Sequence, residues 1–237
     1  MKFFDCNVSL GCMKKIEEID EYMQEYHVDY CGLRSLYSET YHPVDGNNDL
    51  NSLCFQYRNI RPVFTAITTS GDDFPKEEDF LTFVKKSKGI GIYFSPYDDS
   101  LIRSMCIWSM KKYYEVLSEC KIPLFIKSEK ISLHVIYDIL QSFPGLKIVL
   151  LDIHYSLARE LFALMEAVKN LYLETSGLKG YKMISKISNK YGANRMVFGS
   201  RFPVFEPGTS IADIIYSDIS EEEKQIITFN PIFGELL

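Results

Sequence analysis

The sequence predicts a single (β/α)8 TIM barrel that occupies the whole chain. Apolar segments of strand length alternate eight times with segments whose apolar residues recur at helical spacing. The later strand segments are apolar throughout, which is typical of parallel strands that are covered on both faces. The alternation runs through all 237 residues without a linker or a change of composition. We therefore expect one compact domain, residues 1–237, near the short end of the size range of this barrel.

The expected strands are short apolar runs followed by turn-forming or polar residues. They are residues 2–8, 29–36, 60–68, 89–95, 122–128, 146–154, 170–177 and 194–205. The expected helices are residues 13–28, 50–57, 72–87, 98–120, 133–143, 156–168, 181–191, 210–217 and 221–228. A polar loop through His42, Pro43 and residues 45–48 is expected after the second strand.

A doubly wound open sheet is the alternative fold. That fold carries a Gly-rich phosphate turn between its first strand and first helix, and the chain has no GxGxxG motif. Gly89 and Gly91 lie inside an expected strand. The barrel is therefore the preferred prediction.

Composition excludes several classes of partner. The net charge is −6 and the charged residues are interspersed, so nucleic acid is not an expected partner. No apolar run approaches the roughly 20 residues of a membrane helix. The six cysteines form no CxxC pair, which favours reduced thiols in a cytoplasmic protein. Cys6 is expected to face outward, toward the helices.

Polar residues stand where a barrel places its chemistry. Active sites of such barrels lie at the carboxyl ends of the strands, and inward side chains recur there with period two. The polar residues at these ends are Asp5, Asn7, Ser9, Lys127, Asp152, His154, Glu174, Ser176 and Arg201. Arg201 follows the apolar run 196–198 and a Gly-Ser turn, a pattern that predicts a buried strand ending in a loop with close backbone approach.

Six segments resemble, in order, motifs of the second family of the amidohydrolase superfamily. Residues 1–11, MKFFDCNVSLG, resemble its first strand, D-x-H-x-H followed by Leu-Gly. Residues 192–203, GANRMVFGSRFP, resemble its eighth, Phe-Gly-Ser-Asp-x-Pro. The other similar segments are IPLFIKSE (122–129), FPGLKIVLLDIHY (143–155), NLYLETSGL (170–178) and ITFNPIFGELL (227–237). The resemblance implies a TIM barrel and the chemistry of metal-dependent hydrolases and decarboxylases.

The metal ligands that the resemblance implies are all replaced. The two first-strand histidines are Asn7 and Ser9 here, the fifth- and sixth-strand histidines are Lys127 and Asp152, and the eighth-strand aspartate is Arg201. A catalytic zinc ion needs about three ligands from His, Asp, Glu or Cys. Lys127 and Arg201 instead bring positive charge to the place of a dication. We therefore expect no metal and no cofactor at this position.

Lys127, Asp152 and Arg201 are expected to form an ion cluster of net charge +1 at the mouth. One role is to neutralise the vacated metal position, since buried charges need partners. A second role is to bind a small anion, because the planar fork of an arginine matches a carboxylate or a phosphate. In that case Asn7, Ser9 and Ser176 are further ligand-binding candidates, listed with the two cations Lys127 and Arg201.

Asp152, His154 and Glu174 are the candidates for proton transfer. His154 stands two residues after Asp152 and is expected on the same side of the strand, where it either acts as an acid or base or narrows the pocket. Glu174 is a general base if the mouth desolvates it, but a salt bridge to Arg201 is the preferred prediction. Ser176 lacks the surroundings of an activated nucleophile.

The preferred functional prediction is an amidohydrolase-related barrel that has lost metal-dependent hydrolysis and binds a small anionic metabolite at a cationic mouth. One alternative is a metal-independent hydrolase or lyase that acts on a carboxylated substrate. Another is an active metal-dependent hydrolase with unorthodox ligands from Asp5, Asp152, His154 and Glu174. The resemblance is also compatible with a homodimer.

Overall fold

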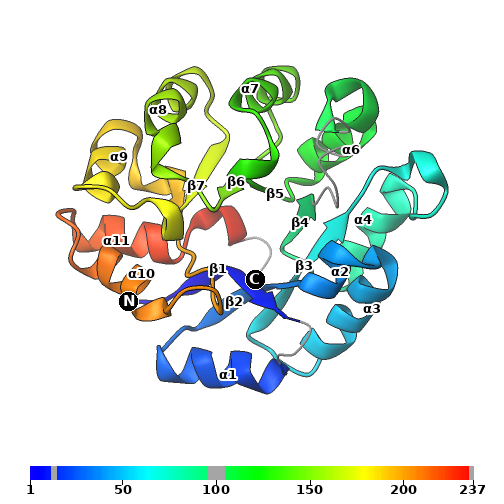
Figure 1. Ribbon diagram of the computed structural model, residues 1–237, viewed down its shortest axis with the longest axis horizontal. Helices are drawn as coiled ribbons and strands as arrows, with labels where there is room; N and C mark the ends of the chain where they lie inside the picture. Colours follow the sequence, from blue (N-terminus) through cyan, green and yellow to red (C-terminus); the bar gives the residue numbers. More distant parts are fainter. Residues whose placement is uncertain (12–14, 95–104, 235–237) are drawn as a thin grey trace.

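Eight parallel strands form the centre of the molecule, and helices surround them (Figure 1). The structure is a computed structural model that describes residues 1–11, 15–94 and 105–234. The strands follow one another around the sheet in chain order. The backbone N–H of Cys6 donates to the carbonyl of Phe198 at 3.0 Å, which joins the first strand to the segment after the last. The chain is therefore a single (β/α)8 TIM barrel, as the sequence predicts.

Every expected strand overlaps an observed one. The strands are β1 (Phe4–Leu10), β2 (Tyr30–Ser35), β3 (Ile60–Ala66), β4 (Gly91–Phe94), β5 (Leu124–Lys127), β6 (Ile148–Leu151), β7 (Leu171–Glu174) and β8 (Met196–Val197). The helices are α1 (Ile16–Glu25), α2 (Leu36–Thr40), α3 (Pro43–Cys54), α4 (Glu77–Lys86), α6 (Ile107–Cys120), α7 (Leu133–Ser142), α8 (Ala158–Ala167), α9 (Met183–Tyr191), α10 (Pro207–Ile215) and α11 (Glu221–Thr228). The predicted start of the fourth helix, at residue 98, lies outside the described residues.

The segment after β2 differs from the prediction. Instead of the end of a strand and a polar loop, the chain forms α2 and most of α3. The Ser35 side chain accepts a hydrogen bond from the backbone N–H of Ser38 and so caps α2. The His42 side chain caps α3 in the same way, with Pro43 in the first turn. Polar residues that indicated a loop are therefore helix-capping residues, and α2 brings a new side chain to the mouth.

The barrel interior holds its own set of apolar side chains. It includes Phe4, Cys6, Val63, Tyr93, Phe125, Val149, Leu151 and Val197. Phe233 closes the bottom, with its ring centroid 4.5 Å from that of Phe4. The prediction that Cys6 faces the helices is wrong, because the register between β1 and β2 shifts between Asp5 and Val8. This irregularity lets Cys6 and the next residue both face inward.

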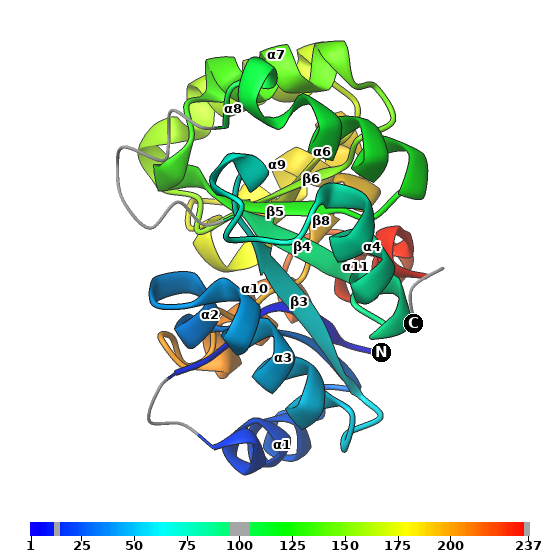
Figure 2. The same ribbon diagram turned by 90° about the vertical axis from the view of Figure 1, so that its right-hand side faces the viewer.

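The N-terminus of the chain lies on the face opposite the mouth of the barrel (Figure 2). The side view places the beginnings of the strands on that side and their carboxyl ends on the other. Among the described residues, no helix has the length and apolar character needed to cross a membrane.

Gly91 offers a direct test of the packing in the barrel interior. A Cβ atom at this position would overlap the ring of Phe125, its inward neighbour on β5. Gly91→Ala should lower the free energy of unfolding by about 2 kcal/mol, the cost of overpacking a filled core. Gly208→Ala is the control, because its Cβ would lie 3.5 Å from Tyr26 Cε1. Urea denaturation measures both variants, and equal stability of the two would contradict the packing.

Candidate functional site

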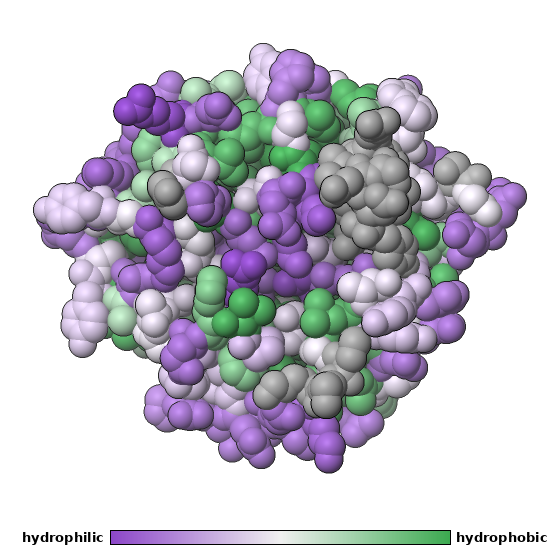
Figure 3. Space-filling view, viewed as in Figure 1, coloured by the Kyte–Doolittle hydropathy of each residue, from purple (hydrophilic) through white to green (hydrophobic). Residues whose placement is uncertain are grey.

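The mouth of the barrel is polar although the strands beneath it are apolar. In the view down the barrel, hydrophilic side chains gather at the centre of this face (Figure 3). On β5, Lys127 lies two residues after Phe125, which faces the interior. On β7, Glu174 lies two residues after Tyr172, which also faces the interior. Both obey the alternation of a β-strand. Period two therefore places these two predicted residues correctly.

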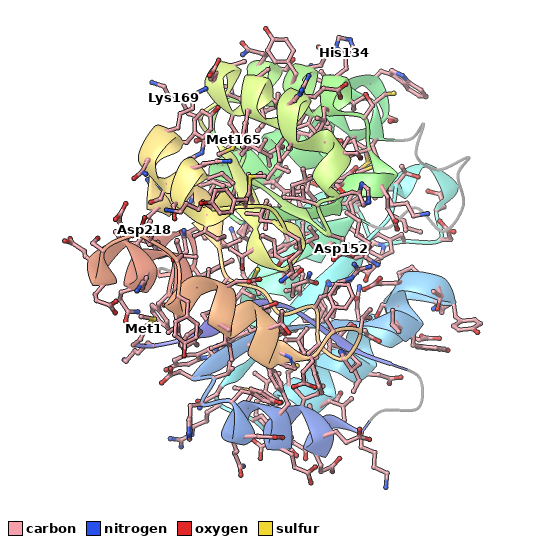
Figure 4. The ribbon with its side chains drawn as sticks, turned by 60° about the vertical axis from the view of Figure 1, so that its left-hand side comes forward. Met1, His134, Asp152, Met165, Lys169 and Asp218 are labelled. Carbon is pink, nitrogen blue, oxygen red and sulfur yellow. The ribbon has the colours of Figure 1, made fainter. Side chains whose placement is uncertain are left out.

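Asp152 and Arg201 reach the mouth by a different route. Leu151, the last residue of β6, already faces the interior, so simple alternation would turn Asp152 outward. Instead Asp152 has φ 53° and Arg201 has φ 62°, the left-handed conformation that reverses the local course of the chain. These two turns bring Arg201 Nε to 3.2 Å from Asp152 Oδ1. The labelled Asp152 in Figure 4 lies near the mouth, away from Met1 and Lys169 at the opposite end.

Asn7 connects the charged groups of the mouth. Its Nδ2 donates to Asp152 Oδ1 at 3.2 Å and to Glu174 Oε2 at 3.0 Å. Its Oδ1 accepts a hydrogen bond of 2.8 Å from Arg34 Nη2. Both protons and the oxygen of this amide group therefore form hydrogen bonds. The two protons are donated to carboxyl groups, and the oxygen accepts from a guanidinium group.

Arg34 and Glu39 are site residues that sequence reasoning missed. Arg34 is 3% exposed on β2, and its Nη1 pairs with Glu39 of α2, which is 4% exposed. The other oxygen of Glu39, Oε2, lies 3.7 Å from Lys127 Nζ. An arginine inside the apolar segment 29–36 was a signal for the first residue. Glu39 carried no comparable signal because its helix was not expected.

The described mouth thus contains three cations and three carboxyl groups. Two pairs, Lys127–Glu39 and Arg201–Asp152, extend the predicted cluster, and the pair Arg34–Glu39 links them to Asn7. The predicted three-residue arrangement is therefore corrected in one respect: the carboxylate beside Lys127 is Glu39. Burial lowers the pKa of Arg34, but the nearby charges of Glu39 and Asp152 outweigh it and the pKa is raised. Arg34 is therefore a permanent buried cation, and its guanidinium lies 4.6 Å from the Tyr93 ring centroid.

Glu174 is fully buried beside this network. Ser176 donates to it twice, from its backbone N–H and from its hydroxyl, the latter at 2.8 Å to Oε2. A Cβ atom on Gly199 would overlap Glu174 Oε1, so the glycine of the eighth-strand loop makes room for this carboxyl group. The predicted salt bridge between Glu174 and Arg201 is wrong, since Arg201 pairs with Asp152.

Burial controls the ionisation of Glu174. Desolvation raises its pKa to about 7, and the negative charge of Asp152 acts in the same direction, while hydrogen bonds from Ser176 and Asn7 act against it. Near neutral pH the carboxyl group therefore exists in both forms. The six ionisable groups then carry a net charge between 0 and +1.

The remaining predicted residues occupy different environments. Ser9 is buried, and its backbone N–H donates to the carbonyl of Phe202 at 3.0 Å. His154 is exposed, with Nδ1 2.8 Å from Ser156 Oγ. Asp5 is fully buried behind the mouth, where it accepts hydrogen bonds from the Tyr22 hydroxyl of α1 and from the backbone N–H groups of Asn7 and Ser200.

A cavity of about 720 Å³ opens beside the network. Asp152, His154, Ser176 and Arg201 line it, together with Phe205 and the acidic residues Glu129 and Glu206. Arg201 lies against the Phe205 ring, with the guanidinium carbon 4.9 Å from the ring centroid. Its side chain is 32% exposed, and among the described residues its two terminal nitrogens have no partner. The cavity therefore presents a free guanidinium edge.

The donor set at the mouth does not fit a divalent metal ion. Within residues 1–11, 15–94 and 105–234, no three His, Cys, Asp or Glu side chains form a group that could hold one. Asp152 Oδ1, the nearest candidate ligand atom, already accepts from Asn7 and Arg201. The Nδ2 group of Asn7 and the cations Arg34, Lys127 and Arg201 present protons and positive charge, which do not coordinate a dication.

An eight-stranded barrel with helices around it places the chain in the class of TIM-barrel proteins. A sequence profile described as amidohydrolase matches residues 47–227, more than half of the chain. The chain therefore belongs to the amidohydrolase family. Comparison with curated protein sequences gave no significant match.

Solved structures of low sequence identity share the whole fold. The 2,6-dihydroxybenzoate decarboxylase from Rhizobium has a TM-score of 0.79 at 10% identity, with 99% of each chain covered. A dihydroxybenzoic acid decarboxylase from Polaromonas, with bound manganese and the inhibitor 2-nitroresorcinol, has a TM-score of 0.75 at 12% identity, covering 99% of this chain and 96% of its own. A probable 2-pyrone-4,6-dicarboxylic acid hydrolase from Acinetobacter baumannii, with citric acid bound, has a TM-score of 0.70 at 10% identity, covering 100% and 99%.

Removal of Arg34 should cost far more stability than removal of a surface cation. Arg34→Met leaves the buried Glu39 with only the more distant Lys127, and it leaves Asn7 Oδ1 without its donor. We expect a loss of about 3–5 kcal/mol in the free energy of unfolding, as for other broken buried ion pairs. Lys190→Met is the control, because its pair with Glu166 is more than half exposed and should be worth less than about 1 kcal/mol. A loss below that of the control would contradict the buried network.

The raised pKa of Glu174 predicts a pH-dependent stability. Folding favours the protonated carboxyl group, so this contribution is complete below the unfolded value of 4.5 and is lost as pH rises through about 7. The difference corresponds to about 3 kcal/mol. Urea midpoints between pH 4.5 and 8 should therefore fall more steeply for the native chain than for Glu174→Gln. Glu119→Gln controls for the loss of one negative charge, and identical slopes for the native chain and Glu174→Gln would rule out the shift.

Proposed function

We propose that this amidohydrolase-family barrel has lost metal-dependent hydrolysis and binds a small carboxylate in the cavity at its mouth. The observation that carries the proposal is the free guanidinium edge of Arg201. This residue stands at the position where the family resemblance implies a catalytic aspartate. Its Nε is held by Asp152, its face lies on Phe205, and its terminal nitrogens adjoin the cavity.

The charges at the mouth support the proposed loss of the metal. Three cations, Arg34, Lys127 and Arg201, now accompany the carboxyl groups of the mouth. A bound dication would meet their repulsion at short range in a poorly solvated site. It would also have to displace the hydrogen bonds that Asn7 makes to Asp152 and Glu174.

The lining of the cavity favours a ligand with a single carboxylate over a polyanion. Arg201 offers two parallel N–H donors, which match the two oxygens of one carboxylate. Glu129 and Glu206, in contrast, line the same cavity and would repel further negative charge, while the lining Lys179 is already paired with Asp213. Ile153, Leu157 and Phe205 provide apolar surface for the rest of a small molecule. The similar structure of a dihydroxybenzoate decarboxylase suggests an aromatic monocarboxylate as a probe. Citrate, which is bound to the similar hydrolase, serves as the polyanionic comparison.

A second candidate function is metal-independent hydrolysis or decarboxylation of such a carboxylate. The observation in its favour is that Ser176 lines the cavity and donates its hydroxyl to Glu174. With a pKa of about 7, Glu174 could exchange a proton with a bound substrate through this hydroxyl group. Glu174 would then be the proton-transfer group, and Arg201 would hold the substrate carboxylate. His154 and Asp152 remain alternative proton-transfer groups on the cavity wall.

Thermal shift and calorimetry with 2,6-dihydroxybenzoate and citrate test the binding proposal. We expect 2,6-dihydroxybenzoate to raise the melting temperature more than citrate, and Arg201→Gln to weaken its binding about tenfold or more, because a charged hydrogen-bond pair is lost. Tighter binding of citrate would contradict the preference for a single carboxylate. Lys169→Ala, which removes an exposed lysine at the other end of the barrel, should leave binding unchanged. Equal affinities of the native chain and Arg201→Gln would refute the role of Arg201.

Elemental analysis separates the metal-free proposal from an active metal enzyme. Protein dialysed against manganese or zinc and then freed of unbound ions should retain far less than one equivalent. Retention of one equivalent, lost in Asp152→Asn or Glu174→Gln, would support the alternative of an unorthodox metal site. Carbon dioxide release from 2,6-dihydroxybenzoate that is lost in Glu174→Gln would favour the second candidate function.

A further inference from the structure

A second cavity lies at the other end of the barrel, between the end of α3, the start of β3 and the end of α4. Its volume is about 400 Å³, which is sufficient for a small ligand. Four basic residues line it, and no acidic residue does. They are Arg58, Arg61, Lys86 and Lys88. In a chain of net charge −6, such a grouping produces a local positive potential against the overall field of the molecule.

These four cations are unpaired within the described part of the chain. None of them forms an ion pair or a side-chain hydrogen bond there, although neighbouring lysines do. Lys112 pairs with Glu78 at 3.0 Å, and Lys85 Nζ lies 2.9 Å from Cys120 Sγ. The basic residues of this cavity therefore keep their hydrogen-bonding capacity for a molecule from outside.

Arg61 supplies a second, independent indication of a ligand. Its Nε atom is buried and has no hydrogen-bond partner among the described residues. A buried donor without an acceptor carries a desolvation cost, which an incoming anionic oxygen would remove. Arg61 belongs to β3, so the barrel fixes the backbone from which this side chain extends.

An aromatic surface adjoins the basic residues. Phe55, directly after α3, is 92% exposed, and Phe83 and Tyr57 line the same cavity. An exposed phenyl ring offers a flat apolar face on which a planar ring can stack. The cavity therefore combines positive charge with a stacking surface.

The ends of two helices account for only part of this charge. Cations near a helix C-terminus are favourable, and Lys86 is the last residue of α4. That effect is confined to the last turn of a helix. Arg61 lies within a strand, and the helix ends therefore do not explain it.

We propose that this cavity binds a small phosphate ester that carries a planar ring, such as a mononucleotide. The basic residues would surround the phosphate, whose two negative charges suit a group of cations without acidic neighbours. The planar ring would stack on Phe55. The site is separate from the cavity at the mouth, where acidic residues accompany Arg201.

Calorimetric titration of the full chain with adenosine monophosphate and with inorganic phosphate tests the proposal. The nucleotide should bind more tightly than phosphate, and added salt should weaken both. The double variant Lys86→Ala/Lys88→Ala should weaken nucleotide binding at least tenfold, and both positions are exposed, so the fold should survive. Arg61→Lys keeps the charge but removes the Nε donor, and should also weaken binding.

Three further variants locate the site. Phe55→Ala should reduce the affinity for the nucleotide but not for phosphate. Lys169→Ala, at an exposed lysine on the same end of the barrel, should change neither. Arg201→Gln should leave nucleotide binding intact, which distinguishes this site from that of the proposed function.

Two outcomes would overturn the proposal. One is an absence of nucleotide binding up to about 10 mM, well beyond the range of metabolite affinities. The other is binding that depends on Arg201 and not on Lys86 and Lys88, which would place the nucleotide at the mouth.

Discussion

The structure of the mouth depends on the need of every buried charge for a partner. Asn7 is the residue through which this need is met, since its single amide group binds Arg34 on one side and Asp152 and Glu174 on the other. Ionic charges in a low-dielectric site are expensive when isolated and tolerable when paired. The mouth therefore tolerates six ionisable groups because each cation is paired with a carboxyl group, and Asn7 hydrogen-bonds to three of the six.

The same constraint applies to the residues at the metal-ligand positions that the resemblance implies. In a family whose motifs imply a dication at this place, the chain has an amide at a first-strand ligand position, a lysine on the fifth strand and an arginine on the eighth. Arg34 provides a positive charge from inside the barrel, and Glu39 on α2 neutralises part of it. A metal ligand introduced at one of these positions would still face the surrounding cations, which oppose a dication.

The two ends of the barrel use charge differently. At the mouth, the carboxyl groups compensate the cations, and among the described residues the terminal nitrogens of Arg201 have no partner. At the opposite cavity, four cations lack partners within the described residues, and the nearby surface is aromatic. A compensated site favours a ligand with little charge, whereas an uncompensated one favours a phosphate. This contrast is the reason for proposing a carboxylate ligand at the mouth and a phosphate ester at the opposite cavity.

The sequence by itself determined the architecture. Continuous apolar strands and helical periodicity are local properties of the chain, so eight strand–helix units and their order could be read directly. It also placed Lys127 and Glu174 correctly, because both lie within strands that alternate regularly. The motif resemblance correctly predicted the family of the chain.

Only the tertiary structure decided which charges meet. The bulge in β1 and the left-handed turns at Asp152 and Arg201 depend on backbone conformation that strand alternation does not predict. Arg34 pairs with Glu39 on α2, a helix in place of which the sequence predicts a strand end and a loop. The prediction fails there because capping residues and turn residues are of the same types. Pairing and burial are properties of groups brought together from distant parts of the chain. The partners of the charged residues and the raised pKa of Glu174 therefore depend on the tertiary structure and not on local sequence.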